Sequence, residues 1–440
     1  MASIYLQTFG CQMNAADSNG IAHQAWSMGC TFTTNPEQAD IIILNTCAIR
    51  EKAESRAYGR IGQFKALKEK NPAAKLLVCG CLAQKDRALM RERAPFIDAL
   101  LGPREYGKLK ETLTAWGVAT DAPPPDALFR APAAEEDPGQ GGFDEYAHLR
   151  ALVNITRGCE KFCTYCIVPY TRGPLESIPP EEIEAQIKME VRRGAREITL
   201  LGQNVNSYYH PASKLDFSGL LLRVGAIQGL TRLTFLTSHP KDFGPDVVDA
   251  LSRLPNVCPR LHLPMQCGSN PVLRAMARLY TIEEYLEKIE HFRARLPGWA
   301  LTTDIIVGYP TETEADFLRT LDVVQRGTFE SAYIFSFSPR AGTPAATMMP
   351  QVDPKEKIRR LQAVNAAQNE ATRRFHESFV GETVSVLVQG PSKKDATRLA
   401  GKTGHNTTVV WPRDGRTDGM PLVDVTVERA FNWGLAGQAA

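Results

Sequence analysis

Short apolar runs alternate with helical patterns through the middle of the chain, and this alternation limits the possible folds more than any other feature. The runs expected to form strands are Leu152–Ile155, Glu197–Leu201, Arg232–Leu236, Pro259–Leu263, Thr302–Val307 and Ala332–Phe337. The stretches expected to form helices are Pro180–Arg193, Ser218–Ile227, Pro245–Leu254, Asn270–Arg295 and Glu314–Arg326. Alternating strands and helices build parallel sheets. Six such units predict an α/β fold, a partial (β/α)6 barrel with its site at the carboxyl ends of the strands.

The N-terminal region repeats this alternation on a smaller scale. Strands are expected at Ser3–Thr8, Asp40–Leu44 and Lys75–Val78, with a helix at Ser18–Met28. Ala57, Ile61 and Phe64 share one helical face and indicate a second helix. The isoleucine run after Asp40 is typical of a strand that is buried on both faces. This region therefore predicts a small parallel α/β sheet domain.

The C-terminal region begins with one long helical pattern, Lys355–Phe379, and then changes character. Strands are expected at Glu382–Val388, Thr407–Trp411 and Leu422–Val427, with turns marked by Gly390, Gly401, Gly404 and Gly415. Such a pattern predicts a small all-β barrel. The preceding segment 119–146 is rich in Pro and Gly and is typical of a linker. We therefore expect an N-terminal α/β domain (1–118), this linker, a barrel core (147–378) and a C-terminal β-barrel (379–440).

The composition is that of a folded globular protein. Of the 440 residues, 43% are hydrophobic and 23% are charged, and the formal net charge is only +2. A polybasic nucleic-acid-binding tail is therefore excluded, although a local basic patch is not. No run approaches the roughly 18 apolar residues that a membrane helix needs. The first residues lack the charged and apolar regions of a signal peptide. We expect a cytoplasmic protein without a membrane partner.

Three of the ten cysteines, Cys159, Cys163 and Cys166, lie within eight residues just after the first strand of the barrel core. In a reducing compartment, such spacing indicates a metal centre rather than disulfides. Thiolates favour zinc or iron–sulfur clusters, and a structural zinc site would need a fourth ligand, which no Cys or His nearby provides. A three-cysteine cluster leaves one iron open, as in the radical S-adenosylmethionine (SAM) enzymes, which this segment closely resembles. The alternative is three unrelated buried cysteines.

Three further cysteines, Cys11, Cys47 and Cys81, each follow one of the predicted N-terminal strands, although 36 and 34 residues separate them. The carboxyl ends of neighbouring parallel strands share one edge of a sheet, so these thiols should meet in space. Neighbouring glycines, Gly10 and Gly80, would allow the backbone to approach a cluster closely. We expect a second three-cysteine cluster, with core packing as the alternative for each cysteine taken singly.

Cys79, two positions before Cys81, is expected to be a strand-end residue, and Cys30, Cys258 and Cys267 lack partners at ligand spacing. We interpret all four as small buried hydrophobic residues.

Several motifs identify a family. The segment from Thr8 to Ser18, which reads Thr-Phe-Gly-Cys-Gln-Met-Asn-Ala-Ala-Asp-Ser, and the two cysteine triads resemble the radical SAM methylthiotransferases. Within that family the chain is most similar to the tRNA-2-methylthio-N6-dimethylallyladenosine synthases. The resemblance covers nearly the whole chain and includes Val168–Gly173, Leu200–Asn206, Thr237–Pro240 and Thr303–Gly308. It also implies that the C-terminal barrel is a TRAM domain, which binds RNA. Two departures from the family pattern, Thr311 for a usual Gly and Cys267 for a usual Ser, are small changes near the expected mouth of the barrel.

The resemblance implies a reaction with two iron–sulfur clusters. Cys159, Cys163 and Cys166 would bind the 4Fe–4S cluster that cleaves SAM to a 5′-deoxyadenosyl radical. The other triad, formed by Cys11, Cys47 and Cys81, would hold an auxiliary 4Fe–4S or 3Fe–4S cluster that carries the sulfur. Two SAM molecules per turnover would place a methylthio group on C2 of N6-dimethylallyladenosine at position 37, next to the anticodon.

Other residues receive weaker roles near SAM in this comparison, with packing, turn or capping functions as alternatives. They are Tyr165, Gly202, Gln203, Asn204, Thr237, Ser238, Asp304 and Arg172.

RNA binding requires clustered cations, because phosphates dominate the affinity. The candidates in the C-terminal barrel are Lys393, Lys394, Arg398 and Lys402, which Asp395 interrupts. The expected partners are a tRNA anticodon stem-loop, a reductase and a sulfur or cluster-assembly donor, and we expect a monomer. The alternatives are the same chemistry on threonylcarbamoyl-adenosine or on a ribosomal-protein aspartate, and a non-catalytic iron–sulfur RNA-binding sensor.

Overall fold

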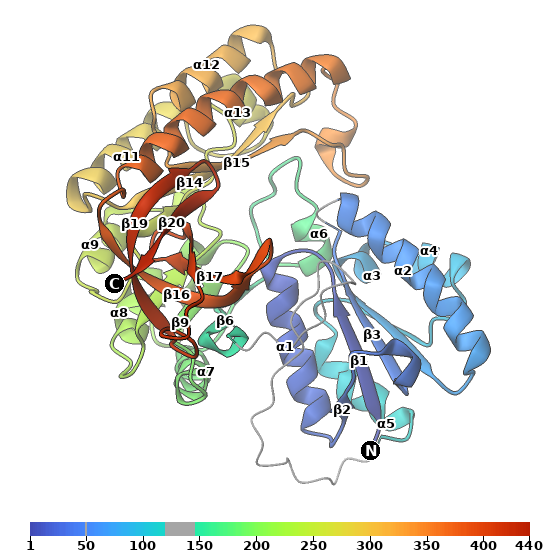
Figure 1. Cartoon of the computed structure of the whole chain (residues 1–440). Helices are drawn as coiled ribbons and strands as arrows, with labels where there is room; N and C mark the ends of the chain where they lie inside the picture. Colours follow the sequence, from blue (N-terminus) through green and yellow to red (C-terminus); the bar gives the residue numbers. More distant parts are fainter. Residues whose placement is uncertain (49–50, 119–145) are drawn as a thin grey trace. The chain divides into compact units, whose positions relative to one another are not determined.

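The computed structural model describes residues 1–48, 51–118 and 146–440, so the expected linker lies almost entirely outside the described residues. The chain forms two compact units (Figure 1). The first contains the described residues before position 119, together with Arg157–Lys161 and Cys166–Glu176. The second contains residues 146–156, Phe162–Tyr165 and Ser177–Ala440. The expected four-part division of the sequence stays a prediction.

A five-stranded parallel sheet forms the centre of the first unit. Its strands are β1 (Ser3–Thr8), β2 (Thr31–Phe32), β3 (Ile41–Thr46), β4 (Lys75–Gly80) and β5 (Ala99–Leu101), in the spatial order β2-β1-β3-β4-β5. Its helices are α1 (Gln12–Trp26), α2 (Glu51–Lys70), α3 (Cys81–Lys85), α4 (Arg87–Arg93), α5 (Leu109–Ala115) and α6 (Val168–Arg172). The three predicted strands are confirmed, whereas the short strands β2 and β5 carry too few residues to show a period.

Apolar side chains cover both faces of this sheet. Ile42 and Leu44 pack with Phe64 of α2, whereas Ile41 and Ile43 pack on the other face in a cluster that includes α1 and α5. Figure 1 shows α1 and α2 on opposite sides of the strands. Every residue of β3 is buried, as the unbroken apolar run predicted.

Helix α1 begins at Gln12, six residues before the predicted start at Ser18. Its first turns bury Asn14 and Ser18, polar residues that an apolar period cannot reveal. The motif after Cys11 is therefore the start of a helix rather than a loop.

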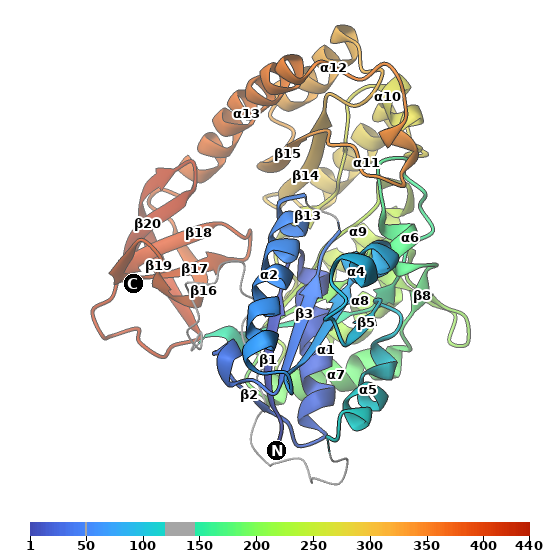
Figure 2. The same cartoon turned by 90° about the vertical axis from the view of Figure 1, so that its right-hand side faces the viewer.

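Six parallel strands form the core of the second unit, close to the predicted positions. One sheet contains β6 (Arg150–Asn154), β9 (Glu197–Leu201) and β12 (Arg232–Phe235), and another contains β13 (Arg260–His262), β14 (Ala300–Val307) and β15 (Ser331–Ser336). A parallel bridge from Leu233 to Val257 extends the first sheet toward the second. The strands follow one another in chain order, which confirms the partial (β/α)6 barrel. Figure 2 shows its last three strands, β13, β14 and β15, side by side.

The helices of this core follow the predicted alternation. They are α7 (Pro180–Arg192), α8 (Phe217–Gly225), α9 (Pro245–Ser252), α10 (Asn270–Ala275), α11 (Ile282–Arg295) and α12 (Glu314–Gln325), before the long α13 (Pro354–Glu377). The prediction of one helix over Asn270–Arg295 was wrong, because the chain turns between α10 and α11. Ala277 and Leu279 have positive φ angles there, and a Thr281–Glu284 capping box starts α11. Short strands of two residues also occur along this part of the chain. They are β7 (Thr156–Arg157), β8 (Glu176–Ser177), β10 (Tyr209–His210) and β11 (Leu215–Asp216).

The C-terminal strands close into a barrel, as predicted. They are β16 (Thr383–Ser392), β17 (Asp395–Thr403), β18 (Thr408–Pro412), β19 (Leu422–Phe431) and β20 (Gly434–Ala439), in the order β16-β17-β18-β20-β19. The prediction that Gly390 and Gly401 mark turns was wrong, because both lie within strands. A bulge accommodates Gly390 at φ 115°, and a Cβ at Gly401 would lie 2.4 Å from the Leu387 carbonyl oxygen.

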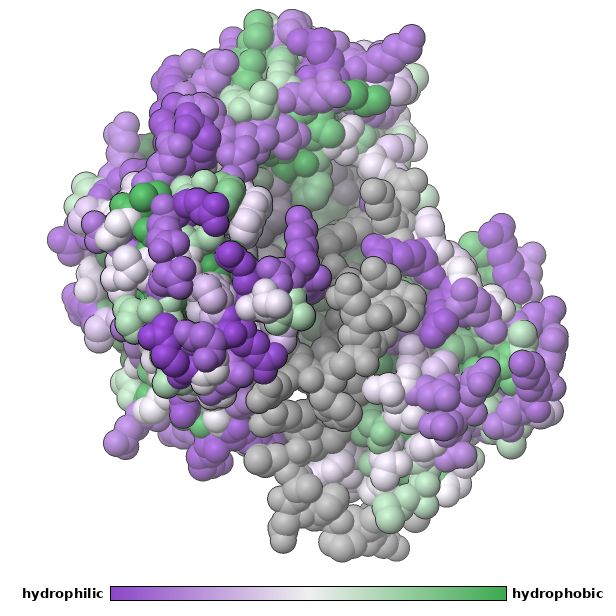
Figure 3. Space-filling view, viewed as in Figure 1, coloured by the Kyte–Doolittle hydropathy of each residue, from purple (hydrophilic) through white to green (hydrophobic). Residues whose placement is uncertain are grey.

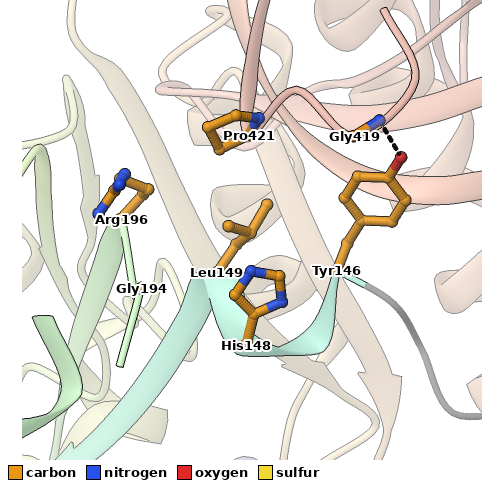
Figure 4. A pocket seen from close by; sticks show the side chains of 7 residues that line it. All are labelled: Tyr146, His148, Leu149, Gly194, Arg196, Gly419 and Pro421. Atoms are coloured by element: carbon orange, nitrogen blue, oxygen red, sulfur yellow. Dashed lines mark hydrogen bonds between the residues drawn. The ribbon is translucent and has the colours of Figure 1, made fainter. Parts of the chain in front are cut away.

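Hydrogen bonds attach this barrel to the core of the same unit. Arg232 donates to the carbonyl oxygens of Lys402 at 2.9 Å and Ser385 at 2.7 Å. The Gly419 amide donates to Tyr146 Oη at 3.0 Å, at the margin of a pocket that Arg196 also lines (Figure 4). Figure 3 shows hydrophilic side chains over much of the barrel surface, with scattered hydrophobic ones. Among the described residues, no helix is long and apolar enough to span a bilayer.

Candidate functional site

The N-terminal cysteines lie at the carboxyl edge of the first unit's sheet, where the sequence placed them. Cys11 follows β1 and caps the N-terminus of α1, Cys47 follows β3, and Cys81 follows β4 as the first residue of α3. The register pairs Thr8 with Asn45 across β1 and β3, so these strand ends are adjacent. Cys47 and Cys81 are fully buried, whereas Cys11 is partly exposed.

Two glycines bring the cysteine loops together. Gly10 has φ 108°, and a Cβ there would lie 2.3 Å from Cys47 Cβ and 2.6 Å from its Sγ. Gly80 has φ 97°, and a Cβ there would lie 2.2 Å from the Thr46 carbonyl oxygen. Only glycine tolerates both the conformation and the contact. The loops after β1 and β3 therefore touch directly beside two of the three thiols.

The thiols differ in acidity because their surroundings differ. A hydrogen bond from the Cys47 thiol lowers the pKa of Cys11 to about 6, against the opposing effect of burial. Burial raises the pKa of Cys81, although the nearby Arg172 guanidinium opposes that shift. Thiolates are the metal-binding form, so the Cys11–Cys47 pair is prepared for a cationic centre.

A buried polar network fixes the loops that carry these cysteines. Asn14 donates to the carbonyl oxygens of Phe9 at 2.9 Å and Thr46 at 3.0 Å. Asn45 donates to the Asn14 carbonyl oxygen and to Ser18 Oγ, each at 2.9 Å. Roles for these residues were not predicted from the sequence. Their signals were the place of Asn14 and Ser18 in the motif after Cys11 and the position of Asn45 two residues before Cys47.

Arg172 belongs to this network, although the family resemblance suggested a role near SAM. Its Nη2 atom donates to Asp17 Oδ2 and to Asn14 Oδ1, each at 2.8 Å. It is the last residue of α6, and its side chain is only 4% exposed. The guanidinium therefore lies beside the N-terminal cysteines of the first unit.

The second cysteine triad lies on a loop that both units share. In the first unit, the Lys161 amide donates to Cys159 Sγ at 3.4 Å, and Cys166 precedes α6. Gly158 has φ 69°, and a Cβ there would lie 2.0 Å from the Pro174 carbonyl oxygen. An amide that donates to sulfur is typical of thiolate ligands in iron–sulfur sites.

In the second unit, Cys163 is buried next to a guanidinium that sequence reasoning missed. Arg278 Nη1 lies 3.4 Å from Cys163 Sγ and 3.4 Å from Tyr165 Oη. Arg278 also donates to the Pro264 carbonyl oxygen at 3.2 Å and to Tyr280 Oη at 3.2 Å. Its position in the break between α10 and α11 explains the omission, because the pattern predicted an unbroken helix there.

Most of the other SAM candidates of the second unit lie where strands end, whereas the expectation of a strand end was wrong for Asp304. Gly202, Gln203 and Asn204 follow β9, Thr237 and Ser238 follow β12, and Asp304 lies within β14. A Cβ at Gly202 would lie 2.1 Å from Thr156 Oγ1. Asn204 donates to Ser207 Oγ and Asp242, and Asp304 faces His262 Nε2 at 3.6 Å.

Several buried polar atoms at these strand ends find no hydrogen-bond partner within the described parts of the chain. They are Thr156 Oγ1, Asn204 Oδ1, Ser238 Oγ and both side-chain heteroatoms of Asn206. Such atoms are costly unless a ligand or water satisfies them, so the second unit fits a polar cofactor at this end of its strands.

No three His, Cys, Asp or Glu side chains among the described residues converge on one metal-ion position. The cysteines of an iron–sulfur cluster bind different irons, so they need not converge as the donors to a single ion do. The all-thiol donor sets fit iron–sulfur clusters.

Cys30, Cys258, Cys267 and Thr311 lie away from these loops in the sequence, whereas Cys79 precedes Cys81 by two residues. Cys30, Cys79, Cys258 and Cys267 are all buried. Burial raises the pKa of Cys267 to about 12, and its Sγ lies 3.3 Å from Thr320 Oγ1. Thr311 has φ 68°, a left-handed conformation that explains the glycine usual in the family.

The candidate RNA-binding cations of the barrel differ in availability. Lys393 and Lys394 are exposed between β16 and β17. Arg398 lies 3.6 Å from Asp395. Lys402 donates to the Asn406 carbonyl oxygen at 3.1 Å and to Thr408 Oγ1 at 2.8 Å, and burial lowers its pKa to about 8. Lys402 is thus committed to contacts within the barrel.

Comparison with known proteins covers both units. Residues 3–102 match the family described as "Uncharacterized protein family UPF0004", and residues 153–324 match the radical SAM superfamily. Among solved structures, the radical S-adenosylmethionine methyltransferase TsrM from Kitasatospora setae is similar with a TM-score of 0.58 and 15% identity, over 79% of this chain and 75% of its own. The cobalamin-dependent S-adenosylmethionine radical enzyme OxsB is similar with a TM-score of 0.51 and 12% identity, over 86% of this chain and 56% of its own. These structures support the fold.

Curated relatives match almost the entire chain. The tRNA-2-methylthio-N(6)-dimethylallyladenosine synthase of Moorella thermoacetica is 43% identical over 98% of this chain and 97% of its own length. The synthases of Thermoanaerobacter sp. strain X514 and Chromobacterium violaceum are 41% and 39% identical, over 99% and 100% of this chain and 92% and 99% of their own lengths. By this full-length similarity, the chain belongs to the family of tRNA-2-methylthio-N(6)-dimethylallyladenosine synthases.

Proposed function

We propose that this chain is a radical SAM tRNA methylthiotransferase that converts N6-dimethylallyladenosine at position 37 to its 2-methylthio derivative. Its full-length relatives carry that name, and its central domain matches the radical SAM superfamily. One structural observation carries the proposal. Cys11, Cys47 and Cys81 gather at one sheet edge of a chain that also has the radical SAM cysteine spacing. A methylthiotransferase needs a sulfur source in addition to a SAM-cleaving centre.

The radical SAM family uses a 4Fe–4S cluster and SAM. In our proposal, Cys159, Cys163 and Cys166 hold that cluster, and Cys11, Cys47 and Cys81 hold an auxiliary 4Fe–4S or 3Fe–4S cluster. The clusters and SAM supply radical formation and sulfur for insertion. The protein positions these groups and excludes water.

The residues of the second unit orient the SAM-binding end. Arg278 fixes Tyr165 and donates toward Cys163 Sγ, so it holds the two side chains in place. Asn204 and Ser238 each offer a polar ligand a buried polar atom that has no hydrogen-bond partner among the residues the structure describes. The lack of a side chain at Gly202 lets Thr156 Oγ1 approach the backbone, because a Cβ there would lie 2.1 Å from that oxygen. Gln203 and Thr237 remain candidates for cofactor contacts at neighbouring strand ends, and Asp304 remains a candidate within β14.

The RNA partner in our proposal is the anticodon stem-loop, which the C-terminal barrel contacts. Lys393 and Lys394 are exposed and suited to phosphate contacts. The target adenine must leave its stack so that C2 reaches the reactive centre. We further propose a cytoplasmic monomer served by a reductase and by a sulfur or cluster-assembly donor.

The first test separates SAM cleavage from other functions. Protein reconstituted anaerobically should form 5′-deoxyadenosine from SAM, and the Cys159→Ala, Cys163→Ala, Cys166→Ala triple variant should form none. A Cys258→Ala variant is the matched control, because that cysteine is buried within the core. Cleavage of SAM by the triple variant would refute the assignment.

The second test identifies the substrate. Nucleoside mass spectrometry of tRNA from a deletion strain should show N6-dimethylallyladenosine in place of its 2-methylthio form. Restoring the gene should return the modification, whereas the Cys11→Ala, Cys47→Ala, Cys81→Ala variant should not. Loss of a modified threonylcarbamoyl-adenosine or of a modified ribosomal protein would favour the alternatives instead.

A further inference from the structure

An ion pair is buried beside the N-terminal cysteines, and the proposed reaction assigns it no role. Asp17 of α1 and Arg172 of α6 lie 2.8 Å apart, with side chains only 9% and 4% exposed. Isolated buried ion pairs contribute little net stability, because desolvation cancels most of their attraction. The position of this pair therefore invites an explanation beyond folding.

The Arg172 guanidinium has an N–H group that is not engaged by its neighbours in the described parts of the chain. Its Nη2 atom serves both Asp17 and Asn14, whereas Nε finds no hydrogen-bond partner among the described residues. A guanidinium offers five N–H donors and accepts none. A buried donor in this state is satisfied best by an anionic acceptor.

Hydrogen bonds place the pair beside the cysteine loops. Asn14, which accepts from Arg172 Nη2 at 2.8 Å, donates to the carbonyl oxygens of Phe9 at 2.9 Å and Thr46 at 3.0 Å, close in sequence to Cys11 and Cys47. Tyr106, in the same buried group, reaches the network through Asn45, with 3.4 Å between Tyr106 Oη and Asn45 Oδ1. The cation and the anion therefore stand close enough to the triad to set its local charge in opposite directions.

We propose that Arg172 and Asp17 form a positioning pair that tunes the auxiliary iron–sulfur cluster, Arg172 by donating toward its sulfur ligands and Asp17 by offsetting that charge. The proposal rests on the assignment of the auxiliary cluster to Cys11, Cys47 and Cys81. Net charge and hydrogen bonds to sulfur set the reduction potential of such clusters. A nearby cation favours the reduced form because that form carries more negative charge, and a nearby anion disfavours it.

The test measures the reduction potential of the auxiliary cluster alone. The full chain is prepared as the Cys159→Ala, Cys163→Ala, Cys166→Ala variant, reconstituted anaerobically, and titrated with redox mediators under EPR detection. Arg172→Met should shift the potential in the negative direction, and Asp17→Asn should shift it in the positive direction. Arg172→Lys, which keeps the charge but loses the planar fork, should lie between the parent and Arg172→Met.

A purely structural role predicts a different pattern. Arg172→Met and Asp17→Asn both break the ion pair, so both should lower the urea midpoint of the apoprotein. Opposite shifts in potential together with a common loss of stability support the proposal. Shifts in the same direction, or none, overturn it. If Arg172→Met fails to retain iron, Asp17→Asn decides, because a potential at or below that of the parent contradicts the proposal.

Iron binding by the parent protein, which carries Cys159→Ala, Cys163→Ala and Cys166→Ala, distinguishes failure of the tuning pair from failure of the proposed auxiliary site. If the parent binds no iron, the auxiliary site and the tuning pair are both refuted. If it binds a cluster whose potential does not follow the two charges, only the tuning pair is refuted.

Discussion

Only glycine fits at position 10, because any larger side chain there would collide with Cys47. The φ of 108° at Gly10 suits glycine, and a Cβ would overlap Cys47 Cβ and Sγ. The sequence analysis attributed the neighbouring glycines to the approach of backbone to a cluster. The structure gives Gly10 a more local task, which is to let two cysteine loops meet before any cluster binds.

The first prediction concerns this contact. Gly10→Ala should destabilise the fold by roughly 2–4 kcal/mol, because the new methyl group displaces Cys47 and the backbone is strained. It should also reduce iron binding by the N-terminal triad in the Cys159/163/166→Ala background. Urea denaturation and iron analysis provide the measurements.

Gly20→Ala is the matched control for that variant. Gly20 lies in α1, and a Cβ there would meet nothing within 4 Å. This variant should be about 0.5–1 kcal/mol more stable than the parent, because alanine favours a helix. Equal behaviour of the two glycine variants would contradict the proposed contact.

The second prediction concerns the acidity of the Cys11–Cys47 pair in the metal-free protein. The pair should lose its first proton with a pKa of about 6, so its alkylation by iodoacetamide should be fast at pH 7 and should fall as the pH drops through 6. Because the folded pKa is lowered, this thiolate stabilises the fold above the ordinary thiol pKa, and the contribution is lost as the pH falls through about 6. Mass spectrometry of tryptic peptides follows each site.

Cys258 provides the contrast, because burial raises its pKa to about 12. Its peptide should remain unmodified throughout the same pH range. Alkylation of Cys11 only above pH 8 would show that its thiol is ordinary.

The break between α10 and α11 positions the side chain of Arg278, which an unbroken helix would not do. Ala277 and Leu279 adopt left-handed conformations on either side of Arg278. That turn carries the Arg278 guanidinium to Cys163 and Tyr165. Neither Gly nor Pro marks the break, so periodicity alone predicted one helix. The readable signal was Thr281 followed by Glu284, the capping box that starts α11.

The third prediction concerns Arg278. Arg278→Met should cost roughly 2–4 kcal/mol, since it removes several buried hydrogen bonds and leaves the Pro264 carbonyl oxygen without this donor. It should also weaken iron binding by the radical SAM triad. Thermal or urea unfolding and iron content of the Cys11/47/81→Ala background measure the two effects.

Arg274→Met tests the same chemical change at an exposed position of α10. Its unfolding free energy should stay within about 0.5 kcal/mol of the parent value, and its iron content should not change. Comparable losses in both variants would mean that Arg278 has no special role.

The elements that could be predicted are those whose pattern is local. The six strands of the core and the long α13 follow apolar runs and helical spacing, which each segment carries by itself. β17 was missed because Gly401 resembled a turn residue, although it fits against the Leu387 carbonyl oxygen. The six cluster cysteines could be proposed because chain order and strand ends place them. The network around Asn14, Asn45 and Arg172 could not, because tertiary hydrogen bonds between distant segments leave no period in a sequence.

At the scale of the whole molecule, the two cysteine triads make separate iron sites in our proposal. The fourth prediction is that anaerobically reconstituted protein binds about eight irons per chain, as two four-iron clusters would. Replacing either triad by alanine should remove about half, because the two sets of ligands are distinct. Iron and acid-labile sulfide analyses measure the cluster content, and Mössbauer spectra distinguish a 4Fe–4S from a 3Fe–4S auxiliary cluster.

A Cys30→Ala variant is the control for iron content, because Cys30 is buried in the apolar core of the first unit. It should retain the full amount. If either triple variant lost all iron, the two sites would depend on each other and the separation would be wrong.

The membership of α6 in the first unit has a consequence for anyone who exchanges parts between relatives. The segments Arg157–Lys161 and Cys166–Glu176 fold with the N-terminal residues, although they follow position 119 in the sequence. A chimera joined at that position would take Asp17 and Asn14 from one parent and Arg172 from the other. The part to exchange is therefore discontinuous in sequence. A functional chimera must take Arg172 from the same parent as the N-terminal sheet.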